Sequence, residues 1–185
     1  MSEPTQPAPS IAPRRNVEIK ARHPALDAAC EVARRVATAW LGQVRQVDTY
    51  FHCRAGRLKL RETSGQAAQL VAYERPNTHG PKTSRYRLVE IADGGELKAA
   101  LTATLGVCCV VDKTREIFLR ENVRIHLDDV RGLGTFIEFE AVLDSDADEA
   151  AGRRQVDWLR AEFGLTDDAL VPASYGDLLA QRSRD

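Results

Sequence analysis

Charged and apolar residues alternate strictly along several stretches of this 185-residue sequence, and that alternation limits the folds open to the chain. In NVEIKAR (16–22), Glu18 and Lys20 lie on one side of an extended backbone, and Val17 and Ile19 lie on the other. The same two-residue period is seen in GRLKLRETS (56–64), NVRIHLDDV (122–130) and TFIEFEAVL (135–143). This pattern predicts β-strands that each carry one charged and one apolar face.

About eight strands are predicted, and most of them are joined by short turns. They are expected at 16–22, 43–53, 56–64, 68–76, 84–92, 107–120, 122–130 and 135–143. Helices are expected at 24–40, 94–106, 147–164 and 174–183. Trp40 and Tyr50 are expected in the core, and residues 76–83 are expected to form a mobile loop. Eight meandering strands with helices between or after them favour an α+β fold built on a closed antiparallel β-barrel.

Length and composition favour one domain, residues 14–182, after a disordered tail of residues 1–13 that holds four prolines and no apolar run. No segment has the pattern of a secretory signal or the ~20 apolar residues of a membrane span, so we expect a cytoplasmic protein without a membrane partner. The net charge of −1 gives no general argument for nucleic acid. The basic residues also lack interleaved aromatic platforms, so no nucleic-acid partner is expected. The sequence does not decide between a monomer and a homodimer.

The charged faces differ in sign from strand to strand. Basic side chains of equal parity dominate the middle strands, at Arg57, Lys59 and Arg61, at Arg85 and Arg87, and at Lys113 and Arg115. Any one of these strands is explained by an ordinary sheet with one face in water. Together they would place like charges on neighbouring strands, which is destabilising unless a polyanion neutralises them.

Carboxylates gather instead on the first strand and the last two, at Glu18, Asp128, Glu138 and Glu140. Carboxylate oxygens are hard ligands that suit Mg²⁺ or Mn²⁺ better than zinc. Two carboxylates at i and i+2 of one strand can hold a divalent ion from one side and leave positions for water and phosphate oxygens. The ExE pattern is weak alone, but beside Arg- and Lys-rich faces it predicts a metal–triphosphate site.

The order of these motifs resembles the CYTH superfamily of triphosphate-tunnel metalloenzymes over nearly all of residues 14–180. NVEIKAR resembles the N-terminal ExExK signature of that family. It is followed by DTYFHCRAGRLKLRE (48–62), YERP (73–76), SRYRLVE (84–90), VDKTREIF (111–118), RIHLDDVRGLGTFIEFE (124–140) and SYGDLL (174–179). The combination is specific, although each motif alone is not.

The resemblance implies an eight-stranded antiparallel tunnel whose polar interior binds a triphosphate and whose apolar exterior is covered by helices. Glu18, Asp128, Glu138 and Glu140 would bind Mg²⁺ or Mn²⁺, and Lys20 would join Glu18, Glu138 and Glu140 in the catalytic set. The implied triphosphate contacts are Lys20, Arg57, Lys59, Arg61, Arg85, Arg87, Lys113, Arg115 and Arg124.

Several further positions are less sharply assigned. Arg75 is ambiguous in parity, and Lys82 is either a solvated loop residue or a lid over bound phosphate. His126 is expected to hydrogen-bond within the charged network rather than to carry protons. One position departs from the family signature, because Asn16 stands where the first Glu is usual. The metal site would lose one negative charge there, which puts a two-metal mechanism in doubt.

The motifs lie closest to the class IV adenylyl cyclase-like branch, which implies conversion of ATP to cyclic AMP and pyrophosphate. The alternative is an inorganic or thiamine triphosphatase, in which water attacks the terminal phosphorus. A noncatalytic sensor of polyphosphate or nucleotide is the third interpretation. In each case the expected partner is a small molecule with a triphosphate, namely ATP, inorganic triphosphate or thiamine triphosphate.

Overall fold

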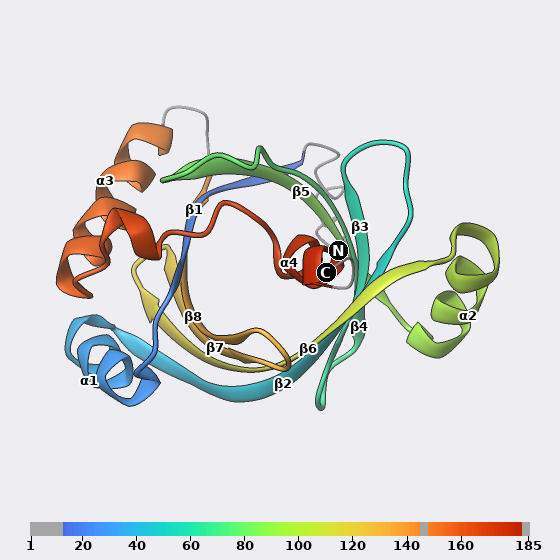
Figure 1. Ribbon diagram of the computed structural model, residues 1–185, viewed down its shortest axis with the longest axis horizontal. Coiled ribbons are helices and arrows are strands. Elements are labelled where there is room, and N and C mark those ends of the chain that lie inside the picture. The colour runs from blue at the N-terminus through green and yellow to red at the C-terminus, as the bar shows by residue number, and fades with distance from the viewer. Residues whose placement is uncertain (1–12, 145–147, 183–185) are drawn as a thin grey trace, which may run out of the picture.

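The computed structural model describes residues 13–144 and 148–182, so the tail predicted for residues 1–13 lies outside it except for Pro13. Eight strands close into an antiparallel barrel in the order β1-β5-β4-β3-β2-β6-β7-β8 (Figure 1). The strands are β1 Arg14–Arg22, β2 Ala39–Phe51, β3 Arg57–Thr63, β4 Ala68–Glu74, β5 Lys82–Ile91, β6 Val107–Arg120, β7 Val123–Val130 and β8 Gly134–Leu143. The predicted eight-stranded antiparallel barrel is therefore confirmed.

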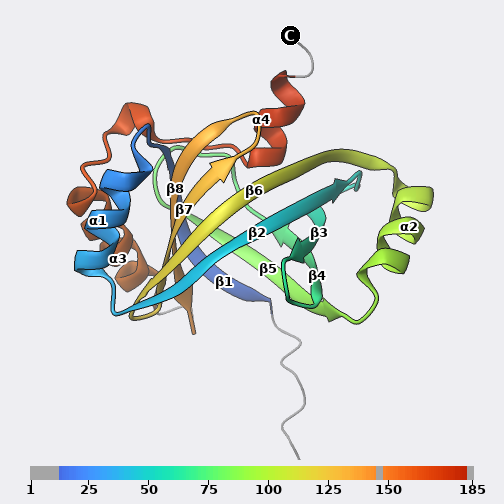
Figure 2. The same ribbon diagram turned by 90° about the horizontal axis from the view of Figure 1, so that it is seen from below.

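In the described part of the chain, four α-helices lie outside the barrel wall. The helices α1 (Leu26–Val36) and α3 (Glu149–Glu162) lie on the same side of it, whereas α2 (Gly94–Leu105) lies on the opposite side (Figures 1 and 2). The helix α4 (Tyr175–Arg182) lies over one end and follows the short 3-10 helix η2 (Asp167–Ala169). Among the described residues, none of the helices combines the length and apolar character needed to cross a membrane.

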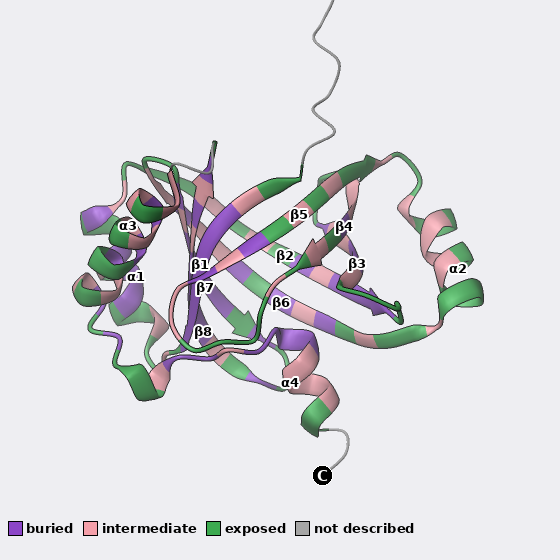
Figure 3. Cartoon of the chain, turned by 90° about the horizontal axis from the view of Figure 1, so that it is seen from above, coloured by how far each residue is buried: buried purple, intermediate pink, exposed green. Residues whose placement is uncertain are grey.

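Most of the apolar core lies outside the barrel wall, between the wall and the helices. Val17 and Ile19 of β1 are at most 2% exposed, and the apolar residues on the outward faces of β7 and β8 are also buried. They form one cluster with Ala33 of α1 and Leu159 of α3. Figure 3 shows β1 buried along most of its length, because its charged face is enclosed by the barrel as well. The apolar face of each amphipathic strand therefore packs outward, and the charged face is left to the interior.

A second, smaller apolar cluster closes the barrel end beneath α4. Its aromatic members are Tyr50, Phe136 and Tyr175, and the rings of the last two pack edge to face with centroids 4.9 Å apart. The helix begins in close contact with the wall, because a Cβ atom on Gly176 would come within 3.1 Å of the Cys109 Sγ. Tyr50 is thus buried, as expected.

The first helix is shorter than predicted. It ends at Val36, and β2 begins at Ala39, where it pairs with Leu119 of β6. The expectation that Trp40 lies in the core is wrong, because this side chain is 63% exposed and donates to Glu116 over 3.0 Å. The helical spacing of apolar residues continues beyond Val36, so the sequence alone predicted a longer helix. Pairing of this segment with β6 overrides the local helical propensity.

Leu159→Ala should destabilise the protein by roughly 2–5 kcal/mol, because the deleted side chain is fully buried between α3 and the barrel wall. Urea unfolding followed by circular dichroism measures the change. Leu41→Ala is the matched control, since that leucine is 57% exposed and the same truncation should cost less than ~0.5 kcal/mol. Equal losses in the two variants would contradict a core placed outside the wall.

Candidate active site

A polar cavity of about 110 Å³ runs through the barrel interior, and charged side chains line it. We call this cavity the lumen. It brings together most of the residues predicted from sequence, contributed by β1, β3, β6, β7 and β8. They are Glu18, Lys20, Lys59, Arg61, Lys113, Arg115, Arg124, Glu138 and Glu140.

Asp48 of β2 is the acceptor at which three lumen cations meet, and sequence reasoning did not single it out. Its carboxylate accepts from Arg61 over 2.8 and 3.0 Å, from Lys59 over 3.0 Å and from Lys113 over 3.3 Å. The side chain is 1% exposed. The signal available in the sequence was its parity, because Asp48 lies directly opposite Arg61 in the β2–β3 ladder. A buried carboxylate surrounded in this way holds the cations in fixed positions.

Burial and neighbouring charges shift the pKa values of Asp48, Lys59 and Lys113. Burial alone would raise the pKa of Asp48, but Arg61, Lys113 and Lys59 hold that pKa well below its usual range. Burial lowers the pKa of Lys59 to about 8, and the Arg61 charge beside it acts in the same direction. Burial likewise lowers the pKa of Lys113 to about 7, helped by Arg115. An anion bound beside the two lysines near neutral pH would therefore favour their protonated, charged forms.

Asp128 of β7 makes a second anchor, two strands along the barrel wall from Asp48. Both of its oxygens accept from Arg115 over 2.6 Å, and the Tyr175 hydroxyl donates to it over 2.7 Å. The Lys20 ammonium lies 3.8 Å above the Tyr175 ring. The structure therefore does not place Asp128 with the other predicted metal ligands, because Arg115 faces it across the β6–β7 pair and occupies both oxygens.

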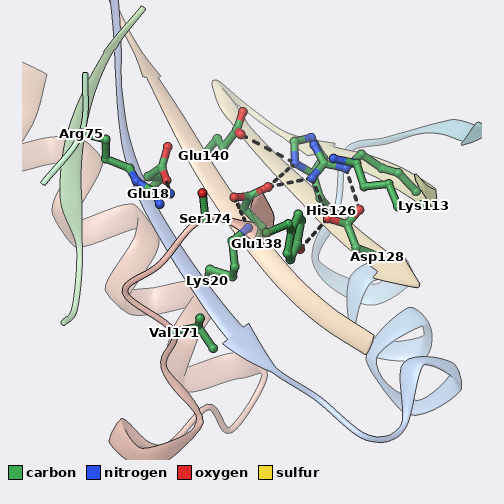
Figure 4. A network of polar contacts seen from close by, with 12 residues as sticks. Glu18, Lys20, Arg75, Lys113, His126, Asp128, Glu138, Glu140, Val171 and Ser174 are labelled. Carbon is green, nitrogen blue, oxygen red and sulfur yellow. Dashed lines mark hydrogen bonds and ion pairs between the residues drawn. The ribbon is translucent and has the colours of Figure 1, made fainter. Parts of the chain in front are cut away.

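The acidic group that the structure does assemble is formed by His126, Glu138 and Glu140, whose ligand atoms lie within 4.8 Å of one another. Figure 4 shows these side chains converging from β7 and β8. Lys20 donates to Glu138, and Arg115 donates to it over 2.7 Å. Burial alone would raise the pKa of Glu138, yet Lys20, His126 and Arg115 hold it well below its usual range. Burial and the Arg115 charge lower the pKa of His126.

These donors fit a divalent ion. Two carboxylates stand side by side, and the His126 Nδ1 atom is buried without a hydrogen-bond partner among the described residues. The Asn16 Oδ1 atom, on the neighbouring part of the lumen wall, is also buried without a hydrogen-bond partner among the described residues. Buried polar atoms almost always have a partner, so the unpartnered nitrogen beside two carboxylates and the unpartnered Asn16 oxygen leave room for a cation.

Glu18 lies opposite Glu140 in the β1–β8 ladder, and Arg75 donates to it. Burial raises the pKa of Glu18, with Glu138 and Glu140 adding to the rise and Arg75 opposing it. Arg75, ambiguous in the sequence, thus points into the lumen.

Lys82 begins β5 and is 3% exposed, so it is neither a solvated nor a loop residue. Its ammonium donates to the carbonyls of Thr78 and Val171 over 3.4 Å each. Burial lowers its pKa to about 8. Little in the sequence pointed to a buried position, since β5 begins directly after a loop with two prolines.

Arg85 and Arg87 do not belong to the lumen, which corrects their predicted placement. Both are exposed on the outer face of β5, whereas Ser84 and Tyr86 line the lumen. The β1–β5 ladder fixes this phase, because Ser84 lies opposite the buried Asn16. Parity showed that the two arginines share a face but could not say which face turns inward.

Arg57 and Arg124 lie toward the ends of the barrel. Arg57 donates to Asp177 of α4 over 2.9 Å, and Arg124, with its side chain 42% exposed, lies 3.6 Å from Glu140. Arg57 also borders a cavity of about 930 Å³, which we call the chamber. The chamber and the lumen share Tyr50, Arg75 and Ser174 in their walls, so the two cavities adjoin.

Comparison with known proteins identifies the family. The CYTH domain model matches residues 14–175. A search of curated protein sequences finds no match. The PH1012 protein from Pyrococcus horikoshii OT3 has a similar structure, with a TM-score of 0.77 at 20% identity, and the match covers 88% of this chain and 98% of that one.

Two further similar structures carry functional descriptions. A proposed adenylate cyclase from Vibrio parahaemolyticus has a TM-score of 0.76 at 22% identity, covering 89% of this chain and 97% of that one. A proposed adenylyl cyclase from Hippeastrum, described as having a dominant triphosphatase activity, has a TM-score of 0.60 at 16% identity, covering 92% and 96%. At these identities the likeness shows a shared fold. With the family model spanning most of the sequence and a charged lumen inside a closed eight-stranded barrel, the protein belongs to the CYTH domain family.

Proposed function

We propose that this protein is a metal-dependent enzyme that acts on a triphosphate held in the lumen. The observation that carries the proposal is the density of buried cations there. Lys20, Lys59, Lys82, Lys113 and Arg115 are each at most 9% exposed. So many cations in a closed space are costly to desolvate, and a polyanion would repay that cost through several charge-assisted hydrogen bonds at once.

The lumen residues would act by positioning and by charge. Lys59, Arg61 and Lys113 would hold phosphate oxygens from one wall while Asp48 fixes their orientation. Arg115, two residues beyond Lys113 on β6, and Lys20 of β1 would bind further oxygens, beside Glu138. Glu138 and Glu140 would hold the divalent ion, which supplies further neutralisation of phosphate charge when bound. Phosphoryl and nucleotidyl transfer need this kind of placement more than covalent chemistry by the protein.

The first candidate reaction is the cyclisation of ATP to cyclic AMP and pyrophosphate. The adjoining chamber of about 930 Å³ supports it, because that volume lies in the range of small-molecule sites and accommodates an organic group beyond the phosphates. In this reaction the ribose 3′-hydroxyl attacks the α-phosphorus in line, and pyrophosphate leaves. The lumen cations would stabilise the charge that develops on the leaving group.

The second candidate is hydrolysis of the terminal phosphate of inorganic or thiamine triphosphate. The small volume of the lumen favours it, since about 110 Å³ lined by cations suits a bare phosphate chain. The triphosphatase activity ascribed to the structurally similar Hippeastrum protein is in line with this candidate.

A product assay separates these reactions. Purified protein is incubated with ATP, inorganic triphosphate and thiamine triphosphate, each with Mg²⁺ or Mn²⁺, and the products are resolved by chromatography. Cyclic AMP with pyrophosphate establishes the cyclase. Orthophosphate from either other substrate establishes the hydrolase. Binding of a triphosphate without turnover would replace both with a sensor.

The double variant Glu138→Gln with Glu140→Gln should lose metal-dependent turnover by at least ~100-fold, because it removes two adjacent anionic oxygen ligands while keeping side-chain volume. The initial rate of product formation at saturating metal measures the loss. Circular dichroism and the melting temperature report whether the barrel is intact. Wild-type rates in a folded double variant would contradict the metal assignment.

Lys59→Ala should weaken binding of inorganic triphosphate roughly tenfold to a hundredfold, because a hydrogen bond to a charged group is worth ~1.5–3 kcal/mol. Binding of orthophosphate should weaken less, since a single phosphate meets fewer lumen cations. Isothermal titration calorimetry gives both affinities. Arg87→Ala, on the outer face of β5, is the control and should change neither. A similar loss in both variants would show that general charge, not the lumen, binds the anion.

Triphosphate affinity should fall between pH 7.5 and pH 9.5, because burial lowers the pKa values of Lys59 and Lys82 to about 8 and that of Lys113 to about 7. Each lysine carries its charge below its pKa and loses it above, so the anion meets fewer cations at high pH. Calorimetry at the two pH values measures the fall. Lys82→Arg keeps a charge at one of these positions and should show a shallower decline. The same slope in wild type and variant would count against titration of Lys82.

A further inference from the structure

His126 lies in an unusual position for a histidine. It is 4% exposed, it faces the lumen from β7, and it pairs with Glu138 across the β7–β8 ladder. Its Nδ1 atom stands 3.6 Å from a Glu138 oxygen and 3.9 Å from a Glu140 oxygen. Both distances are too long for a hydrogen bond, and Nδ1 has no other partner among the described residues. An acceptor buried in this way is costly unless something binds it.

The two neighbouring carboxylates, Glu138 and Glu140, indicate that a cation binds there. Glu140 is paired at longer distances, 3.6 Å from the Arg124 guanidinium and 3.9 Å from the His126 Nδ1 atom. Glu138 is better neutralised, by Lys20 and Arg115. The nitrogen and one oxygen from each carboxylate lie within 4.8 Å of one another, close enough to surround one ion. The group is therefore a set of one nitrogen and two oxygen donors rather than an all-oxygen set.

The kind of donor decides which ion is preferred. Mg²⁺ binds oxygen ligands and keeps several of its waters, so an imidazole adds little to its affinity. Imidazole nitrogen suits the first-row transition ions, whose affinity for such mixed sites exceeds that of the alkaline-earth ions. A nitrogen donor among two carboxylates should therefore shift the preference of the site away from Mg²⁺.

We infer that His126 is a direct metal ligand through Nδ1, and that with Glu138 and Glu140 it makes this site select Mn²⁺ or a similar transition ion over Mg²⁺. This inference rests on the proposed function only for the presence of a divalent ion in the lumen. It replaces the expectation that His126 merely hydrogen-bonds within the charged network, because its nearest carboxylate oxygens lie beyond hydrogen-bond distance.

Pulsed electron paramagnetic resonance of Mn²⁺ bound to the wild-type protein tests the ligation directly. The spectrum is recorded without phosphate and again with pyrophosphate. A nitrogen hyperfine coupling in either sample is the expected result. Absence of that coupling from both samples, with Mn²⁺ bound, overturns the inference. The measurement needs no variant, so it does not depend on whether a substitution folds.

Competition between Mn²⁺ and Mg²⁺ tests the selectivity. His126→Gln should lower Mn²⁺ affinity by roughly tenfold or more and leave Mg²⁺ affinity within about threefold, so that the preference shrinks. His79→Gln is the matched control, because that histidine is exposed in the loop after β4 and should change neither affinity. An unchanged Mn²⁺ preference in a folded His126→Gln protein also overturns the inference.

These readouts are separate from turnover. A nitrogen coupling in a protein that releases no product from any triphosphate would uphold the metal ligation and refute the proposed enzymatic function. Turnover without a nitrogen coupling would uphold the enzymatic function and refute the ligation by His126.

Discussion

The desolvation of charged side chains inside a closed barrel is the constraint on which the rest of this structure depends. An ion taken out of water is tolerated only if close partners replace its hydration. Asp48 and Asp128 supply that replacement from the two strands that flank β6, the first for three cations and the second for Arg115 and the Tyr175 hydroxyl. Because the interior is given to charges, the apolar faces of β1, β7 and β8 turn outward, and α1 and α3 are needed to cover them.

Two pairs of carboxylates in the barrel interior consequently differ in their surroundings. Asp48 and Asp128 are engaged by cations and set the positions of the groups that would meet phosphate. Glu138 and Glu140 stand beside a histidine nitrogen that lacks a hydrogen-bond partner among the described residues, although Glu138 also accepts from Lys20 and Arg115. Preorganised charges of the first kind lose little free energy when a ligand arrives, because they need not reorient. A site built on neighbouring strands of a closed barrel is also held more rigidly than one built on loops.

The C-terminal segment is hydrogen-bonded to the cations of the barrel. Arg75 and Lys82 each donate to backbone carbonyls of this segment, at Pro172 and Val171, over 3.4 Å. Tyr175 follows and closes the lumen beneath α4 through its contacts with Asp128 and the Lys20 ammonium. Arg75 and Lys82 therefore also hold the segment that closes one end of the lumen.

Sequence patterns alone predicted the eight amphipathic strands, the charged faces of β1, β3, β6 and β8, and the family. Strand alternation is local, so it can be recognised without knowing any partner strand. Contacts between distant residues were needed to show which face of β5 turns inward, that Asp48 gathers three cations, that Arg115 occupies Asp128, and that Trp40 lies in a strand and not in the core. Each of these outcomes depends on the ladder between strands distant in sequence. A two-residue period states which side chains share a face, but the neighbouring strand fixes where that face points.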